Sequence, residues 1–188
     1  MNIIGVESLV YGSEDVTAAI KFHEDWGLEP TEKGKSGADF KLPDDTTVHV
    51  RAIDDPALPP PSVPGSTARE VIWGVEDKDS LDAIGAELSR DRDLTTDAQG
   101  GLHSHDDLGY RIGFRLTIRK PKPVHLPETN TVWTAPRINQ RAEIFSRSAP
   151  RQQRMFHVVY WAPGDTERHA MFYMERLGVR LTASIKGL

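Results

Sequence analysis

The residues best suited to bind a metal ion are histidines that fall on predicted strands. His157 lies in the segment MFHVVYWAP (155–163), whose β-branched and aromatic residues predict a strand. Because side chains alternate along a strand, His157, Val159 and Trp161 should share one face. A neutral imidazole suits a borderline metal such as Fe(II), and a strand holds a ligand rigidly. The alternative is a histidine at a strand start that only forms a hydrogen bond.

The other histidines are weaker candidates. His103 and His105 lie two residues apart, which places both imidazoles on one strand face as a possible chelate, but they precede a turn. We therefore expect a solvated loop edge there. His49 alternates with polar residues and predicts ordinary sheet surface, and His23 falls on an apolar helix face as a packed side chain.

Composition excludes several classes of protein. The 188 residues are 38% hydrophobic, which is enough for a proper core, and contain no cysteine, so thiolate chemistry and disulfides are excluded. No run approaches the roughly 20 apolar residues of a membrane span, and the N-terminus lacks the features of a secretory signal. Residues 1–118 are strongly acidic, which argues against nucleic acid as a partner. We expect a cytoplasmic protein with no membrane contact.

The elements that would position these residues repeat along the chain. A strand at 3–12 precedes a helix with Ser13 as the expected N-cap, after which Gly27 suits the helix end. One helical face carries apolar residues and His23 at i, i+3, i+4 and i+7. Three short strands follow, around 28–33, 38–42 and 46–53. The first unit is therefore βαβββ.

The same order returns after a proline-rich connection. A strand at 69–75 leads to a helix capped by Asp77 or Asp79, and Leu81, Ile84 and Leu88 form its apolar stripe. The segments LTTDA, GLHSH and YRIGFRLTI predict three more strands. One such unit cannot bury its own sheet face, so two are expected to pair in an α+β fold.

A third start follows a basic stretch. The expected strand at 155–163 precedes a helix capped by Asp165 or Thr166, and a further strand is expected over 179–185. Its expected apolar stripe consists of Ala170, Tyr173, Met174 and Leu177. We predict a two-module N-terminal domain over 1–120, a basic linker over 121–153 and an incomplete domain over 154–188.

Paired βαβββ modules resemble the vicinal oxygen chelate superfamily, which includes glyoxalase I, bleomycin-resistance proteins and the type I extradiol dioxygenases. The motif His157-Val-Val-Tyr-Trp-Ala-Pro-Gly-Asp165, with Ala170-Met-Phe-Tyr173 and Leu177-Gly178, is similar to the opening of an extradiol catalytic domain. The resemblance closest in layout is to 2,3-dihydroxybiphenyl dioxygenases: a two-module domain, a linker and then the histidine-bearing strand.

This resemblance implies a chemistry and a ligand set. His157 would be the first ligand of a non-haem Fe(II), or alternatively Mn(II), and Val159 would line the substrate pocket. The second His and the Glu ligand of the family are not in this sequence, and no catalytic residue is assigned. The implied partners are a catechol-type substrate and O2, and the implied assembly is a homo-oligomer.

The N-terminal modules are expected to be metal-free. Glu7 and Glu70 stand where His157 stands in its own strand, and Gly113 replaces the carboxylate that metal-binding relatives carry. We expect both glutamates to pair with Arg111, Arg115 or Arg51 across the sheet. Two other functions stay open: a non-catalytic binding protein of the bleomycin-resistance or glyoxalase type using the cleft of 1–120, and a paralogue that has lost its chemistry and packs as an oligomer.

Overall fold

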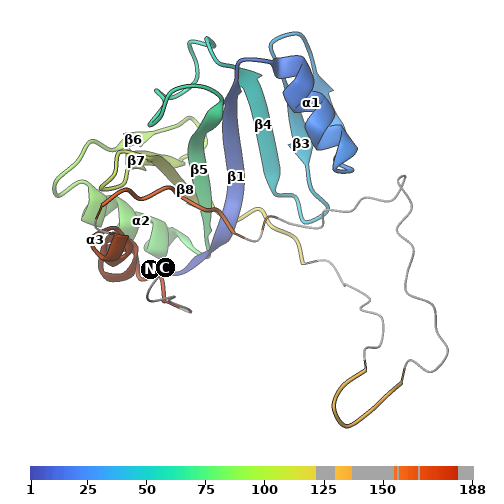
Figure 1. Cartoon of the computed structure of the whole chain (residues 1–188). Coiled ribbons are helices and arrows are strands. Elements are labelled where there is room, and N and C mark those ends of the chain that lie inside the picture. The colour runs from blue at the N-terminus through green and yellow to red at the C-terminus, as the bar shows by residue number, and fades with distance from the viewer. Residues whose placement is uncertain (122–129, 137–154, 156, 165, 182–188) are drawn as a thin grey trace.

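One mixed sheet of eight strands organises the part of the chain that the structure describes. The computed structural model describes residues 1–121, 130–136, 155, 157–164 and 166–181. The strand order is β2-β3-β4-β1-β5-β8-β7-β6, so the strands of each repeat stay together (Figure 1). The two repeats meet where β1 (Ile3–Ser13) runs antiparallel to β5 (Thr67–Val75). This arrangement confirms the α+β fold of paired βαβββ modules.

Module 1 consists of β1, the helix α1 (Val16–Asp25) and three short strands. These are β2 (Pro30–Lys33), β3 (Gly37–Lys41) and β4 (Thr47–Ala52). The last strand returns to lie parallel to β1, whereas β2, β3 and β4 pair antiparallel. The predicted positions of all five elements are confirmed to within a few residues.

Module 2 repeats this topology. β5 is followed by α2 (Lys78–Leu88), and then by β6 (Thr95–Thr96), β7 (Leu102–His105) and β8 (Arg111–Leu116). β8 lies parallel to β5 just as β4 lies parallel to β1. Because the two modules share this connectivity, equivalent strands can be compared directly.

Aspartates cap both helices. The Asp77 carboxylate accepts a hydrogen bond from the Ser80 amide at 2.7 Å, as expected for an N-cap. In module 1 the cap is Asp15, which accepts from the Ala18 amide at 2.9 Å, so the prediction of Ser13 was wrong. Ser13 is instead the last residue of β1, because the strand continues past Tyr11, the last residue of its apolar pattern. Gly27 has φ of 89°, the left-handed conformation expected there.

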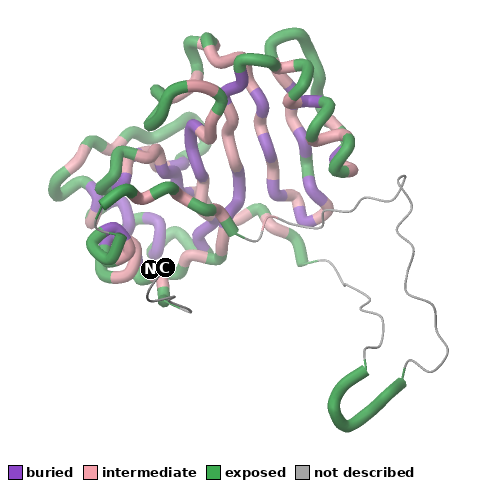
Figure 2. Tube along the Cα trace, in the orientation of Figure 1, coloured by how far each residue is buried: buried purple, intermediate pink, exposed green. Residues whose placement is uncertain are grey.

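A separate apolar core lies under each helix, and the buried positions run along the central strands in Figure 2. In module 1, Ile20 of α1 packs on Phe40, Val48 and Val50. In module 2, the predicted stripe of α2 is buried, and it packs on Ile112 and Phe114. The strand residues between these positions therefore face away from the helices.

The C-terminal segment adds a third layer over module 2. The helix α3 (Thr166–Met171) continues into a π-helical turn, η1 (Phe172–Arg176), and Phe172 and Leu177 join the module 2 core. Figure 1 shows α3 beside α2. The predicted stripe was correct only in part: Leu177 is buried, but the other fully buried residues are His169 and Phe172. A π turn holds more residues than an α turn, which rotates the buried face.

Residues 157–163 do not form a strand, so that prediction was wrong. A strand needs a neighbour for its backbone hydrogen bonds, whereas this segment crosses the molecule near Tyr110 rather than extending either edge of the sheet (Figure 1). The expected cap Asp165, residues 182–185 of the last expected strand and most of the basic stretch lie outside the described residues. Just before the predicted linker, Lys120 pairs with Asp45 of the acidic N-terminal part at 2.6 Å.

Candidate functional site

The face of the sheet opposite the helices carries the polar side chains of both modules. On β4, Val48 and Val50 lie in the helix-side core, so His49 and Arg51 point the other way. On β8, the same alternation sends Arg111, Gly113 and Arg115 to this face. A cleft of about 350 Å³ opens there between the modules. Its lining residues are Val10, His49, Arg51, Asp55, Ala57, Leu58, Pro59, Glu70, His103 and Arg111.

In module 2, His103 lies between two carboxylates. Its Nδ1 is 2.8 Å from Glu70, whose side chain is only 7% exposed, and its Nε2 is 3.1 Å from Asp97. The hydrogen bond with Glu70 raises the pKa of His103 in spite of its partial burial. Burial acts to raise the pKa of Asp97, but the hydrogen bonds that it accepts from His103 and from backbone amides lower it overall. The two carboxylates therefore favour the protonated form of this imidazole in a three-residue array.

This array overturns two sequence-based expectations. His103 is a half-buried ion-pair partner rather than part of a solvated loop edge, and Glu70 pairs with it rather than with an arginine. Gly113 explains the geometry, because a Cβ at that position would lie 3.3 Å from His103 Nδ1 and 3.1 Å from Ile72. The residue read as a missing metal ligand therefore makes room for the histidine.

Module 1 holds a different and more exposed array on the same face of the sheet. Asp39 lies 2.7 Å from His49 Nδ1 and 2.6 Å from Arg51, and these three side chains are 23–31% exposed. Partial burial acts to raise the pKa of Asp39, but hydrogen bonds from Arg51 and His49 lower it overall. One carboxylate here contacts both an imidazole and a guanidinium, so His49 is a hydrogen-bonded partner of Asp39 rather than plain sheet surface.

Glu7 has a structural role. Its carboxylate is fully buried next to a bulge in β1 and accepts hydrogen bonds from Thr117 Oγ1 and from the Ile118 amide at 2.7 Å. The expected pairing with an arginine was therefore wrong. Hydrogen bonds to backbone and hydroxyl donors satisfy a buried carboxylate without a cation. These hydrogen bonds hold Thr117 and Ile118, the residues that follow β8, against β1.

The predicted metal ligand and pocket residue lie on the outer side of the C-terminal segment. His157 is exposed and borders an apolar groove of about 470 Å³ on module 1, next to Met155 and His23. Val159 is 84% exposed at the rim of a cavity of about 410 Å³. His23 itself is packed as predicted, with its ring stacked on Phe40.

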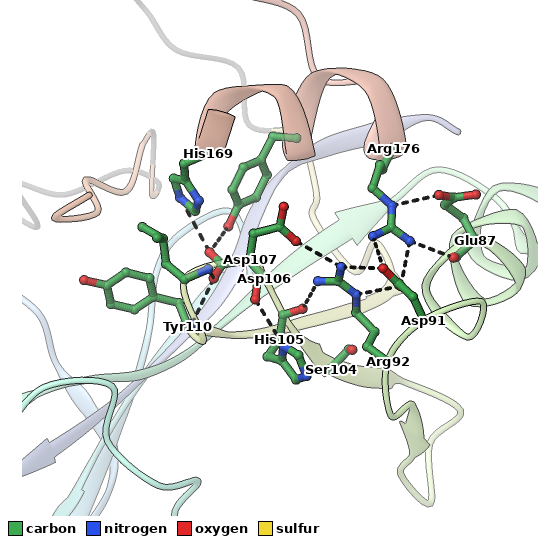
Figure 3. Close-up of polar contacts among 12 residues, drawn as sticks. Glu87, Asp91, Arg92, Ser104, His105, Asp106, Asp107, Tyr110, His169 and Arg176 are labelled. Atoms are coloured by element: carbon green, nitrogen blue, oxygen red, sulfur yellow. Dashed lines mark hydrogen bonds and ion pairs between the residues drawn. The ribbon is translucent and has the colours of Figure 1, made fainter. Parts of the chain in front are cut away.

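A polar cluster that sequence reasoning missed attaches this segment to module 2 (Figure 3). Asp106 is 1% exposed; one of its oxygens accepts amide hydrogen bonds within the β7–β8 turn. The other accepts the Tyr173 hydroxyl at 2.8 Å and lies 3.6 Å from His169 Nε2. Burial raises the pKa of Tyr173 well above its usual range, so the phenol stays a donor. The sequence signal for this role of Asp106 was the turn Asp106-x-x-Gly109. An aspartate at the first position of such a turn accepts hydrogen bonds from the backbone amides that follow it.

Ion pairs extend the same interface. Arg176 contacts Glu87 and Asp91 of module 2, both at 2.8 Å, and Arg92 bridges Asp91 and Asp107 (Figure 3). The hydrogen bond with Asp91 raises the pKa of Arg176. The C-terminal segment is thus fixed to module 2 by charge as well as by Phe172.

The described residues do not form a complete metal site. Within them, no three His, Asp or Glu side chains converge closely enough to hold an ion. His103 has a carboxylate on each ring nitrogen, and Glu7 is committed to the backbone. The described part of the chain also contains no helix with the length and apolar character of a membrane span.

Comparison with known proteins identifies the fold. No family model matches the sequence, and no curated protein matches it. Among solved structures, the Mn(II)-bound glyoxalase from Novosphingobium aromaticivorans matches with a TM-score of 0.50 at 17% identity, over 66% of this chain and 43% of that one. Homoprotocatechuate 2,3-dioxygenase from Brevibacterium fuscum matches with a TM-score of 0.51 at 13% identity, over 64% of this chain and 34% of that one.

The same enzyme from Arthrobacter globiformis matches with a TM-score of 0.51 at 14% identity, over 64% of this chain and 38% of that one. All three neighbours belong to the vicinal oxygen chelate superfamily. At such identities the likeness shows the fold: this chain has the vicinal oxygen chelate fold, as its repeats predicted. The chain spans well under half the length of these neighbours.

Proposed function

We propose that this chain is part of an extradiol-type ring-cleaving dioxygenase, with His157 as one ligand of a non-haem Fe(II) or Mn(II). The fold agrees with that of proteins named as dioxygenases and as a glyoxalase. The order of the chain, with a two-module unit before the histidine-bearing segment, also supports the proposal. A catechol such as 2,3-dihydroxybiphenyl would be the substrate, with O2 as the second reactant.

The observation that carries the proposal is the alternation of exposure along residues 157–161. His157, Val159 and Trp161 are exposed, whereas Val158 and Tyr160 are half-buried, so the predicted two faces persist in an extended segment. The inner face rests on module 2, where the Tyr160 ring lies 5.0 Å from the Tyr110 ring, and Tyr160 also stacks on Tyr173 of η1. The outer face carries His157 and Val159, the two residues that the proposal assigns to the metal and the substrate pocket.

The described residues do not hold the metal alone. They contribute one imidazole, and the second His and the Glu of the implied ligand set are not in this sequence. When bound, the metal would bring a catechol and O2 together for ring opening beside the two hydroxyls. This chain's own contribution would be to position His157 by docking its segment on module 2 through Phe172 and Asp106.

The first measurement is the intact mass of the natural protein purified from its source. A mass well above the 21.0 kDa of residues 1–188 would mean that further chain can supply ligands. A mass equal to 21.0 kDa would contradict the proposal, since one histidine cannot hold a catalytic metal.

The functional test loads that natural protein with Fe(II) under anaerobic conditions and then adds air and 2,3-dihydroxybiphenyl. We expect bound iron and a yellow ring-fission product from the unsubstituted protein, and loss of both in H157A. The matched control is H105Q, at a partly buried histidine whose Nδ1 lies 3.1 Å from the Asp106 carbonyl oxygen. Iron retention and ring cleavage in H157A equal to those in H105Q would contradict the role of His157, and no product from several catechols would contradict the activity.

A further inference from the structure

Arg111 has an unusual place in the cleft between the modules. It is partly buried, and its Nε is fully buried with no hydrogen-bond acceptor. Among the described residues, no ion pair or hydrogen bond engages its guanidinium. A buried donor without an acceptor destabilises the protein, the more so when it is charged, and a bound anion would offset this cost.

The neighbouring carboxylate is already committed. Val71 of β5 pairs with Ile112 of β8, so Glu70 lies beside Arg111 in the parallel register. Yet Glu70 bonds to His103 on its other side at 2.8 Å. In the same cleft Arg51 is paired with Asp39. Arg111 is therefore the cleft cation whose charge no carboxylate of the described chain balances at contact distance.

A fastened loop forms one wall of the cleft and supplies apolar surface. Arg69 is 5% exposed and donates to the carbonyls of Ile53 and Pro59, which fixes residues 53–59 against the sheet. Leu58 and Pro59 of this loop line the cleft, opposite Val10 of β1. The cleft thus combines one unbalanced cation with a hydrocarbon wall that is held in place before any ligand arrives.

We propose that this cleft binds a small organic monocarboxylate. The carboxylate accepts hydrogen bonds from the Arg111 guanidinium, and the hydrocarbon part packs on Val10, Leu58 and Pro59. A cavity of about 350 Å³ suits a ligand with a single ring. A dianion such as phosphate is disfavoured, because Glu70 and Asp55 line the same cleft and repel a second negative charge. The proposed binding uses neither His157 nor a metal, and Arg111 and Glu70 also line the cavity that Val159 borders.

The test is calorimetric titration of the metal-free 188-residue chain with benzoate, and with benzamide as the uncharged analogue of equal shape. We expect saturable binding of benzoate, no measurable binding of benzamide, and a dissociation constant raised about tenfold or more in R111Q, as expected for loss of a charge-assisted bond. R111K keeps the charge but loses the planar fork, and its affinity should fall between the two.

Arg115 provides a matched control. It lies four residues along the same strand and on the same face, and its guanidinium also has buried atoms without an acceptor, but it does not line the cleft. R115Q should bind benzoate within about twofold of the unsubstituted chain. The proposal is overturned if the unsubstituted chain shows no saturation, if benzamide binds as well as benzoate, or if R111Q and R115Q bind alike. Thermal unfolding of each variant shows that a loss of binding is not a loss of fold.

Discussion

The two modules share a backbone and differ in how their polar faces are balanced. In module 1 the carboxylate of Asp39 serves both His49 and Arg51. In module 2 two carboxylates hold one histidine, and no carboxylate of the described chain lies at contact distance from Arg111. The duplicated topology therefore places polar side chains on the same face of the sheet, while their identities decide which module can accept a ligand.

The helix faces differ as well. Module 2 is covered by the C-terminal segment, whose Phe172 is 3% exposed. Module 1 has no such cover among the described residues: Phe22 and Trp26 of its helix are each 52% exposed beside an apolar groove. The C-terminal segment thus distinguishes the modules and links the candidate metal ligand to the second of them.

The largest expected effect concerns that cover. F172A should lower the free energy of unfolding by about 3–4 kcal/mol, because it leaves a cavity in the module 2 core. F22A removes a ring of equal size from an exposed position of module 1 and should cost less than about 1 kcal/mol. Urea unfolding of both variants measures the contrast, and equal losses would show that the C-terminal segment does not depend on this contact.

The next largest effect is expected at the carboxylates that contact the two histidines, Glu70 in module 2 and Asp39 in module 1. E70A leaves a half-buried histidine beside an empty site and should destabilise the protein by about 2 kcal/mol. D39A acts at a more exposed array and should cost about 1 kcal/mol. Chemical denaturation is again the measurement. A larger loss for D39A would mean that module 1 carries the more important ion pair.

A substitution at Gly113 tests whether the space at this position allows His103 to reach Glu70. In G113A the added Cβ would crowd Ile72 and His103, so we expect a loss of about 1–2 kcal/mol. Nuclear magnetic resonance titration of His103 should then show a lower pKa, because the imidazole is displaced from Glu70. An unchanged pKa with reduced stability would locate the strain at Ile72 alone.

The smallest effect is a dependence on pH. The pKa of His103 is raised above its ordinary value of 6.5, so the cation stabilises the folded state fully below about pH 6.5. This contribution is lost as pH rises through the folded-state pKa, and the urea midpoint should decline over that range. H103Q should remove the decline, whereas H49Q should retain it. A decline of equal slope in H103Q would assign the effect to another group.

Much of the fold could be predicted from local pattern. Apolar spacing identified both helices, and the strands of each module followed from β-branched runs and turn residues such as Gly27. These features depend on neighbours within a few positions, so a single sequence contains them. The pattern was less successful where elements compete: Ser13 was assigned to a helix cap although β1 extends through it.

The partners of the polar residues were decided by tertiary structure. Glu70 meets His103 across 33 positions of chain and Glu7 meets Thr117 across 110, and arginines on the same face were equally plausible partners for both. A bulge in β1, the absence of a side chain at Gly113 and the register of β8 select one pairing over the other. The sequence by itself determined the repeated modules and the two faces of residues 157–161. Only the packed structure determined which charges meet, because hydrogen bonds act over about 3 Å and the folded strands alone bring distant residues that close.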